Sequence, residues 1–199
     1  MMARSGGKSV RTGKFVVLSS PSGGGKSTII EHLLERNRDF TYSISATTRP
    51  PRDDEVNGES YWFIGTDEFT ERRNRGEFLE WEEVYGDYYG TPKQSPEKAV
   101  SRGFHVLFDL DVKGALKLKG ARPETILIFL LPPSFDTLEE RLRKRGTENE
   151  NRLQDRLVTA RWECDQADRF DHVVVNRNLE ETVNTVERII REHIQEDSL

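Results

Sequence analysis

The sequence predicts an α/β fold in which a five-stranded parallel sheet is flanked by helices and interrupted by a small β-rich insertion. The first observation is a glycine-rich loop between a short apolar run and a helical pattern, which gives the order strand, loop, helix. The second is that further short apolar runs alternate with helical patterns, as a parallel sheet requires. The five runs cover residues 15–18, 42–45, 104–111, 125–131 and 171–176. The third is a segment of different texture, residues 46–94, in which short aromatic strands follow one another closely.

Composition bounds the size of the protein and its environment. The chain has 199 residues, 34% apolar and 33% charged, which is enough for one domain with a sizeable core. Its net charge of −5 argues against general binding to nucleic acid or to a membrane surface. The longest apolar run, 126–131, is too short to span a bilayer, and residues 1–14 lack the apolar region of a signal peptide. Cys164, the single cysteine, fits a reducing compartment, so we expect a cytoplasmic protein.

The glycine-rich loop carries the first chemical signal. Its sequence is Ser19-Ser20-Pro21-Ser22-Gly23-Gly24-Gly25-Lys26-Ser27-Thr28. Consecutive glycines let backbone N–H groups turn inward without Cβ clashes, and the positive end of the next helix points at the same place. This predicts a phosphate-binding loop, with Lys26 on the β- and γ-phosphates of a nucleoside triphosphate and the Ser27 hydroxyl on Mg²⁺. Ser20 departs from the pattern G-x-x-x-x-G-K-[ST], which begins with glycine.

Two arginines, Arg49 and Arg52, follow the predicted strand 42–45. The two prolines between them end regular structure, and ligands of open α/β sheets bind at the C-terminal ends of strands. Because one guanidinium group can bind two oxygens, the pair suits a phosphate monoester. Solvated surface charge is the alternative for the same residues.

The β-rich insertion follows these arginines. Its predicted elements are strands at 61–64 and 78–81, a helix at 67–75 ended by Gly76, and a hairpin turn at Gly86-Asp87 that leads into 88–91. We expect Trp62 and Trp81 to lie in the core, because aromatic side chains on strands are usually buried. The tyrosines near the arginines are candidates to donate hydroxyls to a phosphate.

The apolar strand 104–111 ends in two aspartates. A carboxylate in this position suits the organisation of Mg²⁺ beside a phosphate loop, which favours Asp109 as a metal-organising residue acting through water. For Asp111, capping of the short helix predicted at 115–119 is the alternative. Farther along, Ser134 is predicted to cap a helix that runs to about Arg145.

A basic segment continues from this helix to Arg161, interleaved with acidic residues. We predict a helical lid over about 141–160 that brings arginines to a transferring phosphoryl group. Ordinary surface pairing between residues i and i+4 is the alternative. The strand 171–176 and an amphipathic helix from about 180 to 195 complete the chain.

Several motifs appear in a characteristic order and spacing. They are Ser45 with Thr47-Thr48-Arg49-x-x-Arg52, Glu55-Val56-Asn57-Gly58 before Tyr61, Phe78-Leu79-Glu80-Trp81, Tyr88-Tyr89-Gly90-Thr91, Asp109-Leu110-Asp111 and Arg145-Gly146-Thr147-Glu148. With the phosphate loop, this set resembles the guanylate kinase family from Lys14 to the final helix. Two positions depart from the family pattern: Ser20 replaces glycine, and Lys113 replaces a common glutamine.

The resemblance implies ATP-dependent phosphorylation of GMP to GDP, with Mg²⁺ as cofactor and ATP and GMP as small-molecule partners. It implies catalytic roles for Lys26, Arg49, Arg145 and Arg156. The implied ATP-binding residues are Ser20, Pro21, Ser22, Gly23, Gly24, Gly25, Lys26, Ser27, Thr28, Arg141 and, near the adenine, Asn176. The implied GMP-binding residues are Arg49, Arg52, Tyr61 and Tyr89 on the phosphate, Ser45, Glu80 and Thr91 around the guanine, and Gly90, Asp109 and Asp111 beside them. Ser27 and Asp109 are the metal residues.

The same resemblance divides the chain into a flexible tail at 1–14, a kinase core at 15–45 and 95–199 that includes the lid, and a GMP-binding subdomain at 46–94. The phosphate of GMP is itself the nucleophile and is largely dianionic near neutral pH, since its second pKa is about 6. No general base is needed, which agrees with the many arginines.

The main alternative is a catalytically inactive guanylate-kinase-like binding module. Such a module would have little need of the complete set of phosphate-binding residues that this chain carries. A phosphate-loop GTPase is the other, but the chain lacks an Asn-Lys-x-Asp guanine motif. We expect neither a nucleic acid nor a membrane partner.

Overall fold

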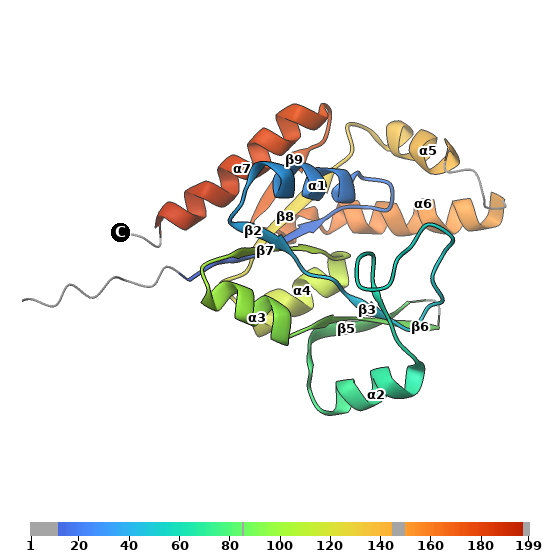
Figure 1. Cartoon of the computed structure of the whole chain (residues 1–199). Coiled ribbons are helices and arrows are strands. Elements are labelled where there is room, and N and C mark those ends of the chain that lie inside the picture. The colour runs from blue at the N-terminus through green and yellow to red at the C-terminus, as the bar shows by residue number, and fades with distance from the viewer. Residues whose placement is uncertain (1–11, 85, 145–149, 197–199) are drawn as a thin grey trace, which may run out of the picture.

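The protein is built on two sheets (Figure 1). The computed structural model describes residues 12–84, 86–144 and 150–196. The larger sheet consists, in spatial order, of β2 (Phe40–Tyr42), β7 (His105–Asp109), β1 (Phe15–Ser19), β8 (Ile126–Leu131) and β9 (His172–Val175). Every neighbouring pair in this sheet is parallel. The prediction of a five-stranded parallel sheet is therefore confirmed.

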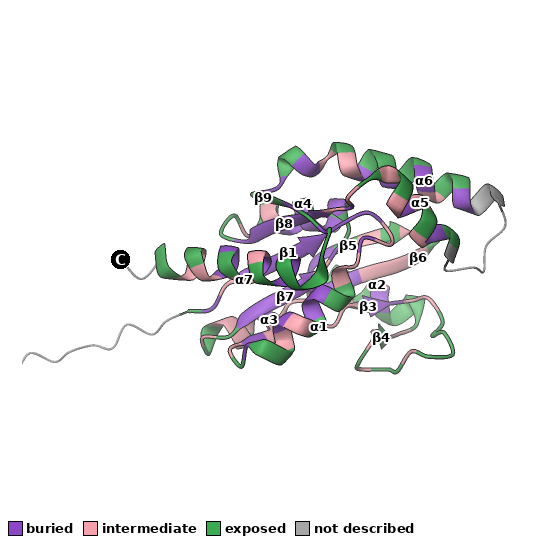
Figure 2. Cartoon of the chain, turned by 90° about the horizontal axis from the view of Figure 1, so that it is seen from above, coloured by how far each residue is buried: buried purple, intermediate pink, exposed green. Residues whose placement is uncertain are grey.

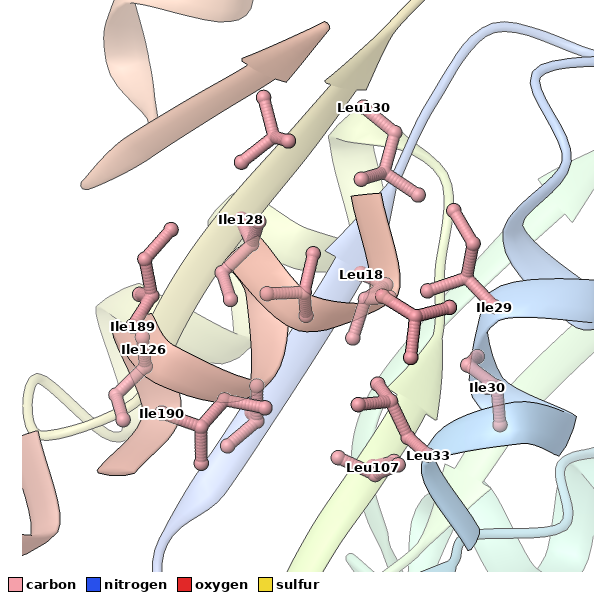
Figure 3. Packing of buried hydrophobic residues seen from close by; sticks show 14 of the residues in the cluster. Leu18, Ile29, Ile30, Leu33, Leu107, Ile126, Ile128, Leu130, Ile189 and Ile190 are labelled. Carbon is pink, nitrogen blue, oxygen red and sulfur yellow. The ribbon is translucent and has the colours of Figure 1, made fainter. Parts of the chain in front are cut away.

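Side chains of the central strand β1 alternate between two cores. Val16 and Leu18 face α1 (Lys26–Arg36) and α7 (Leu179–Glu196), whose apolar residues cover one side of the sheet (Figure 3). Phe15 and Val17 face the opposite core, which includes residues of α4 (Val112–Ala121) and of the short 3₁₀ helix η1 (Ala167–Arg169), with Ala99 and Val100 of α3 (Gln94–Ser101) packed against it. All five β1 residues are buried, as a strand covered on both faces requires (Figure 2).

The smaller sheet contains, in order, β4 (Trp62–Phe63), β3 (Ala46–Thr47), β6 (Asp87–Pro92) and β5 (Phe78–Val84). The helix α2 (Thr66–Asn74) places the fully buried Phe69 between Phe78 and Tyr88, at ring-centroid distances of 4.6 and 5.4 Å. Gly76, at φ 67°, follows this helix as predicted. The β-rich insertion thus forms a separate sheet with its own small core.

The expected burial of Trp62 and Trp81 is wrong, since their exposed fractions are 43% and 37%. The first three residues of β5, Phe78, Leu79 and Glu80, are all buried, and the register of the strand is irregular between Phe78 and Glu80. Trp81 follows on the exposed face, where its ring lies under the guanidinium group of Arg73 at 4.9 Å. The sequence pattern identified the strand but not its inner face.

Several element boundaries differ from the predictions. The strand expected at 42–45 shares only Tyr42 with β2, because the chain then leaves the parallel sheet and the Ser45 carbonyl accepts a hydrogen bond from the Trp62 N–H at 2.9 Å. The helix α3 was not predicted, and α4 is longer than the predicted 115–119.

The lid region contains α5 (Phe135–Lys144) and α6 (Glu150–Asp165). Leu138 and Leu142 of α5 pack with Leu157 of α6 in a small apolar cluster. Arg145 and most of the predicted tail lie outside the described residues. In the described part of the chain, no helix combines the length and the apolar character needed to cross a membrane.

Candidate active site

The candidate site lies at the C-terminal edge of the larger sheet. Parallel strands end at the same edge, and ligands of open α/β sheets bind there. The phosphate loop follows β1, Asp109 ends β7, Asn176 follows β9, and the chain from β2 leads through Ser45 to the arginine segment. The fold therefore brings together residues that are far apart in sequence, such as Gly24 and Asn176, which are separated by 152 positions.

Asn176 fastens the phosphate loop to the end of β9. Its side-chain amide donates to the Gly24 carbonyl at 2.9 Å and its Oδ1 accepts from the Thr182 hydroxyl at 3.2 Å. Gly25 has φ 89°, and a Cβ there would lie 2.9 Å from the Asn176 amide nitrogen. Glycine is required at this position both by the left-handed backbone and by the close approach. The sequence predicts Asn176 beside the adenine. In the structure its hydrogen bonds hold the phosphate loop in place.

Lys26, Ser27 and Asp109 meet at the start of α1. The Lys26 ammonium donates to the carbonyl and the hydroxyl of Ser20, both at 3.2 Å, and lies 3.7 Å from Asp109 Oδ1. The Ser27 hydroxyl donates to Asp109 Oδ2 at 3.2 Å. Ser20, which departs from the glycine of the loop pattern, thus supplies an additional acceptor for the lysine.

Arg49 is the centre of the arginine segment. Its Nη2 donates to Glu55 Oε1 at 2.7 Å, its Nη1 donates to the Pro50 carbonyl at 2.7 Å, and its guanidinium carbon lies 5.6 Å from the centre of the Tyr61 ring. Glu55 Oε2 also accepts the Arg52 backbone N–H at 2.8 Å. The hydrogen bond from Arg49 lowers the pKa of Glu55 and raises that of Arg49, so both groups stay charged.

The tyrosines lie against the same arginine. The Tyr61 and Tyr89 rings are 6.0 Å apart in an edge-to-face arrangement, and Tyr89 contributes, after Glu55, to the raised pKa of Arg49. The structure therefore groups the predicted phosphate-binding residues Arg49, Tyr61 and Tyr89. Arg52 joins this group through its backbone N–H, which donates to Glu55.

Glu80 is buried, with an exposed fraction of 8%, and accepts a hydrogen bond from the Thr91 hydroxyl at 2.5 Å. Burial raises the pKa of Glu80 to about 7, and the negative charge of Asp111 acts in the same direction. A Cβ on Gly114 would lie 3.2 Å from Glu80 Oε2, so glycine there lets α4 approach the carboxylate. The neighbouring Gly90 is likewise covered by aromatic rings, because its Cβ would lie 3.0 Å from Phe69.

Asp111 caps α4. Its Oδ1 accepts the backbone N–H of Gly114 at 2.7 Å, so the helix-cap interpretation is confirmed for this oxygen. Lys113, the second departure from the family pattern, points toward α6, where its ammonium lies 6.0 Å from the Trp162 ring.

The lid arginines occupy different environments. Arg156 Nη2 donates to the Ser22 hydroxyl at 2.5 Å and so reaches the phosphate loop. Arg141 is half-buried on α5. Arg143 pairs with Glu139 one turn earlier at 2.8 Å, as the surface-pairing alternative expects. Arg145 is outside the described residues.

Two acidic residues with notable surroundings received no role from the sequence. Glu55 stands inside a recognised motif but was given no role, although a carboxylate three residues after Arg52 is a natural partner for an arginine pair. Glu163 on α6 was also missed. Its signal was available, because it continues the inward face marked by Leu153, Leu157 and Ala160, where a charged residue is unexpected.

Comparisons with known proteins agree with this geometry. A family model described as guanylate kinase matches residues 12–193. A guanylate kinase of Prochlorococcus marinus is 44% identical over 178 residues, which cover 89% of this chain and 97% of that protein. One of Carboxydothermus hydrogenoformans is 45% identical over 178 residues, covering 89% and 87%. The crystal structure of a guanylate kinase from Anaplasma phagocytophilum matches with a TM-score of 0.75 and 33% identity, over 92% of this chain and 86% of that one.

Proposed function

This chain belongs to the guanylate kinase family and phosphorylates GMP to GDP with ATP, and we propose that the site divides this work among three groups of residues. The phosphate loop binds ATP, the smaller sheet and the arginine segment bind GMP, and the helices α5 and α6 supply arginines to the transferred phosphoryl group. This division corresponds to a core at 15–45 and 95–199, a GMP-binding subdomain at 46–94 and a lid at about 141–160.

On the ATP side, Lys26 leaves Ser20 to bind the β- and γ-phosphates, while the loop from Ser20 to Thr28 surrounds them and, except at Pro21, turns its backbone N–H groups toward them. Ser27 and Asp109 are suited to hold Mg²⁺, because hydroxyl and carboxylate oxygens are the ligands that this ion prefers. No cluster of three or more His, Cys, Asp or Glu side chains in the described part of the chain is arranged around a metal, which fits an ion held largely by phosphates and water. Bound there, Mg²⁺ would neutralise charge on the transferred phosphoryl group.

On the GMP side, Arg49, Arg52, Tyr61 and Tyr89 bind the phosphate. The contact of Glu55 and Pro50 with two nitrogens of Arg49 supports this role, because it fixes the orientation of the guanidinium group before the substrate arrives. The guanine is bound by three side chains, with Gly90, Asp109 and Asp111 beside it. These are Ser45, Glu80 and Thr91.

The reaction needs positioning and charge neutralisation. The GMP phosphate attacks without a general base, since its second pKa is about 6. Lys26, Arg49, Arg145 and Arg156 counter the repulsion between two polyanions, with Arg141 nearby on α5. We also propose a cytoplasmic location, which the single cysteine of the chain supports because it fits a reducing compartment.

The observation that carries this assignment is the buried hydrogen bond between Thr91 and Glu80, which leaves a carboxylate at the base site. Guanine offers N1–H and an amino group to a carboxylate, whereas N1 of adenine is an acceptor. The test is ADP formation from ATP with each nucleoside monophosphate in turn. GMP must be preferred to AMP by orders of magnitude, and comparable turnover with AMP would refute the assignment.

A further inference from the structure

Ser20 stands where the pattern of the phosphate loop begins with glycine, and the reaction as described gives its hydroxyl group no task. The residue directly follows β1 at the base of the loop, and its exposed fraction is 1%. A hydroxyl group is buried without a large penalty only when it is hydrogen-bonded. Its partners therefore indicate what the side chain does.

The Ser20 hydroxyl is held in one orientation. It donates to the Pro21 carbonyl at 2.9 Å and accepts from the Lys26 ammonium at 3.2 Å. Because its single proton is engaged by Pro21, a lone pair faces the lysine. A Cβ on Gly24 would lie 2.4 Å from this oxygen, so the turn of the loop closes tightly over the serine side chain. The hydroxyl is thus fixed as an acceptor for Lys26.

Lys26 directs two of its three donors to this one residue. Its ammonium also donates to the Ser20 carbonyl at 3.2 Å, and it lies 3.7 Å from Asp109 Oδ1, beyond the length of a hydrogen bond. Glycine at position 20 would offer the carbonyl but no hydroxyl. This chain therefore gives the lysine one more acceptor than the pattern of the loop provides. Phosphate oxygens that bind the ammonium have to replace that acceptor.

We propose that Ser20 is a positioning residue that holds Lys26 on the phosphate loop while the nucleotide site is empty, and that its hydroxyl thereby lowers the affinity for nucleotides with a β-phosphate. The hydroxyl and the phosphates compete for the same ammonium group. The hydrogen bond from Lys26 stabilises the empty loop and is lost when nucleotide binds, so its effect appears in the Kd. Phosphoryl transfer begins after the exchange, so the chemical step is not affected.

This inference rests on the proposed contact of Lys26 with the phosphates, so the experiment tests both. ATP and ADP are each titrated calorimetrically into the nucleotide-free protein. Ser20→Ala removes the hydroxyl and leaves the Pro21 carbonyl paired, because that carbonyl also accepts the Gly24 N–H at 2.8 Å. We expect the Kd for ATP and for ADP to fall about fivefold, as the loss of one competing hydrogen bond predicts. The Kd for GMP and the single-turnover rate at saturating ATP should not change.

The neighbouring serine supplies a matched control. Ser19 is fully buried, and its hydroxyl has no hydrogen-bond partner among the described residues. Ser19→Ala removes the same atom one position earlier and should leave the Kd for ATP unchanged. Ser20→Gly also removes the hydroxyl, but it frees the backbone of the empty loop. We expect it to lower the Kd for ATP by less than Ser20→Ala does.

A double-mutant cycle connects the effect to the lysine. Lys26→Met removes the ammonium group but keeps a long unbranched side chain, and it should raise the Kd for ATP about tenfold or more. Adding Ser20→Ala to this variant should then change the Kd by less than about 1.5-fold, because no ammonium remains for the hydroxyl to hold.

Three outcomes overturn the inference. If Ser20→Ala leaves the Kd for ATP unchanged or raises it while Lys26→Met weakens binding, the hydroxyl does not compete with the phosphates, although the role of Lys26 stands. If Ser20→Ala strengthens ATP binding equally with and without the Lys26 ammonium, the effect comes from the loop and not from the lysine. If Lys26→Met binds ATP as tightly as the wild type, the proposed role of Lys26 fails and the inference fails with it.

Discussion

Because Glu80 can ionise, the affinity for GMP should depend on pH, and the substitution Glu80→Gln should remove most of that dependence. A carboxylate accepts hydrogen bonds from guanine N1–H and the 2-amino group, whereas a protonated carboxyl group presents a donor of its own. Burial raises the pKa of Glu80 to about 7, so this group changes charge within the range in which enzymes are assayed. Glu80→Gln keeps the shape but cannot ionise.

The size of the effect follows from these pKa values. With a pKa of about 7, Glu80 is about 90% ionised at pH 8 and about 10% ionised at pH 6, which predicts a ninefold weakening of GMP binding. The GMP phosphate, with a second pKa of about 6, adds about twofold. The wild type should therefore lose about 20-fold in affinity, and Glu80→Gln only about twofold. At pH 8 the variant should bind GMP weaker by about 1–3 kcal/mol.

The assay is calorimetric titration of GMP into the nucleotide-free protein at pH 6, 7 and 8. Thr91→Val supplies a second check, because the Thr91 hydroxyl bonds the charged carboxylate and lowers the pKa of Glu80. Its removal should move the midpoint of the profile to higher pH. If the affinity of the wild type for GMP changes between pH 6 and pH 8 no more than that of Glu80→Gln, then Glu80 does not bind the base in its ionised form.

The same ionisation affects stability, with a definite sign. The folded pKa of about 7 lies above 4.5, the ordinary pKa of a glutamate side chain, so the folded state retains a proton that the unfolded state releases. The free energy of unfolding should fall as pH rises from 4.5 through 7, by about 3 kcal/mol in total. Urea unfolding should find Glu80→Gln more stable than the wild type at pH 8 and little different at pH 4.5.

Three further predictions concern other parts of the molecule. Lys26→Ala should lower kcat about a hundredfold or more without unfolding the protein, and retention of a tenth of the activity would exclude its assigned role. Arg49→Lys should raise KM for GMP about tenfold and leave KM for ATP unchanged, because lysine lacks the planar fork; equal effects on both substrates would contradict a GMP-specific role. Burial lowers the pKa of His172, and so does His193, whose Nε2 lies 2.8 Å from Nε2 of His172. The free energy of unfolding should therefore fall as pH drops below 6.5, and His193→Gln should reduce that loss. An unchanged pH dependence in the variant would show that His193 does not affect the ionisation of His172.

The parts of the fold predictable from sequence are those encoded by local pattern. The apolar run at 15–18 specifies a strand and the glycines before Lys26 specify a turn, and neither depends on residues elsewhere in the chain. Both predictions are confirmed. The end of β2 is different, since residue 45 pairs with Trp62 and its conformation depends on a strand that comes later. The helix α3 has only eight residues and a single buried one, Pro96, so it offers few apolar positions from which a helical pattern can be read.

Candidate residues were predictable by type and order, whereas their partners were not. The sequence singled out Glu80 and Arg49, but burial beside α4 and the bonds to Glu55 and Pro50 depend on chain segments folding together. Asn176 illustrates the same limit, because its bond to the Gly24 carbonyl spans most of the chain. A motif specifies which side chains are present; the packed fold determines their charge and contacts.

This distinction matters most for the acidic residues, because a site that unites two polyanions should exclude negative charge. Glu55 is ionised, but its charge is matched by Arg49 at 2.7 Å. Glu80 is buried, and burial raises its pKa to about 7, so partial protonation reduces its charge near neutral pH. Counting carboxylates in the sequence therefore overstates the repulsion that the GMP phosphate encounters. Pairing of Glu55 with Arg49 and burial of Glu80 both reduce the negative charge that acidic side chains place at the proposed GMP site.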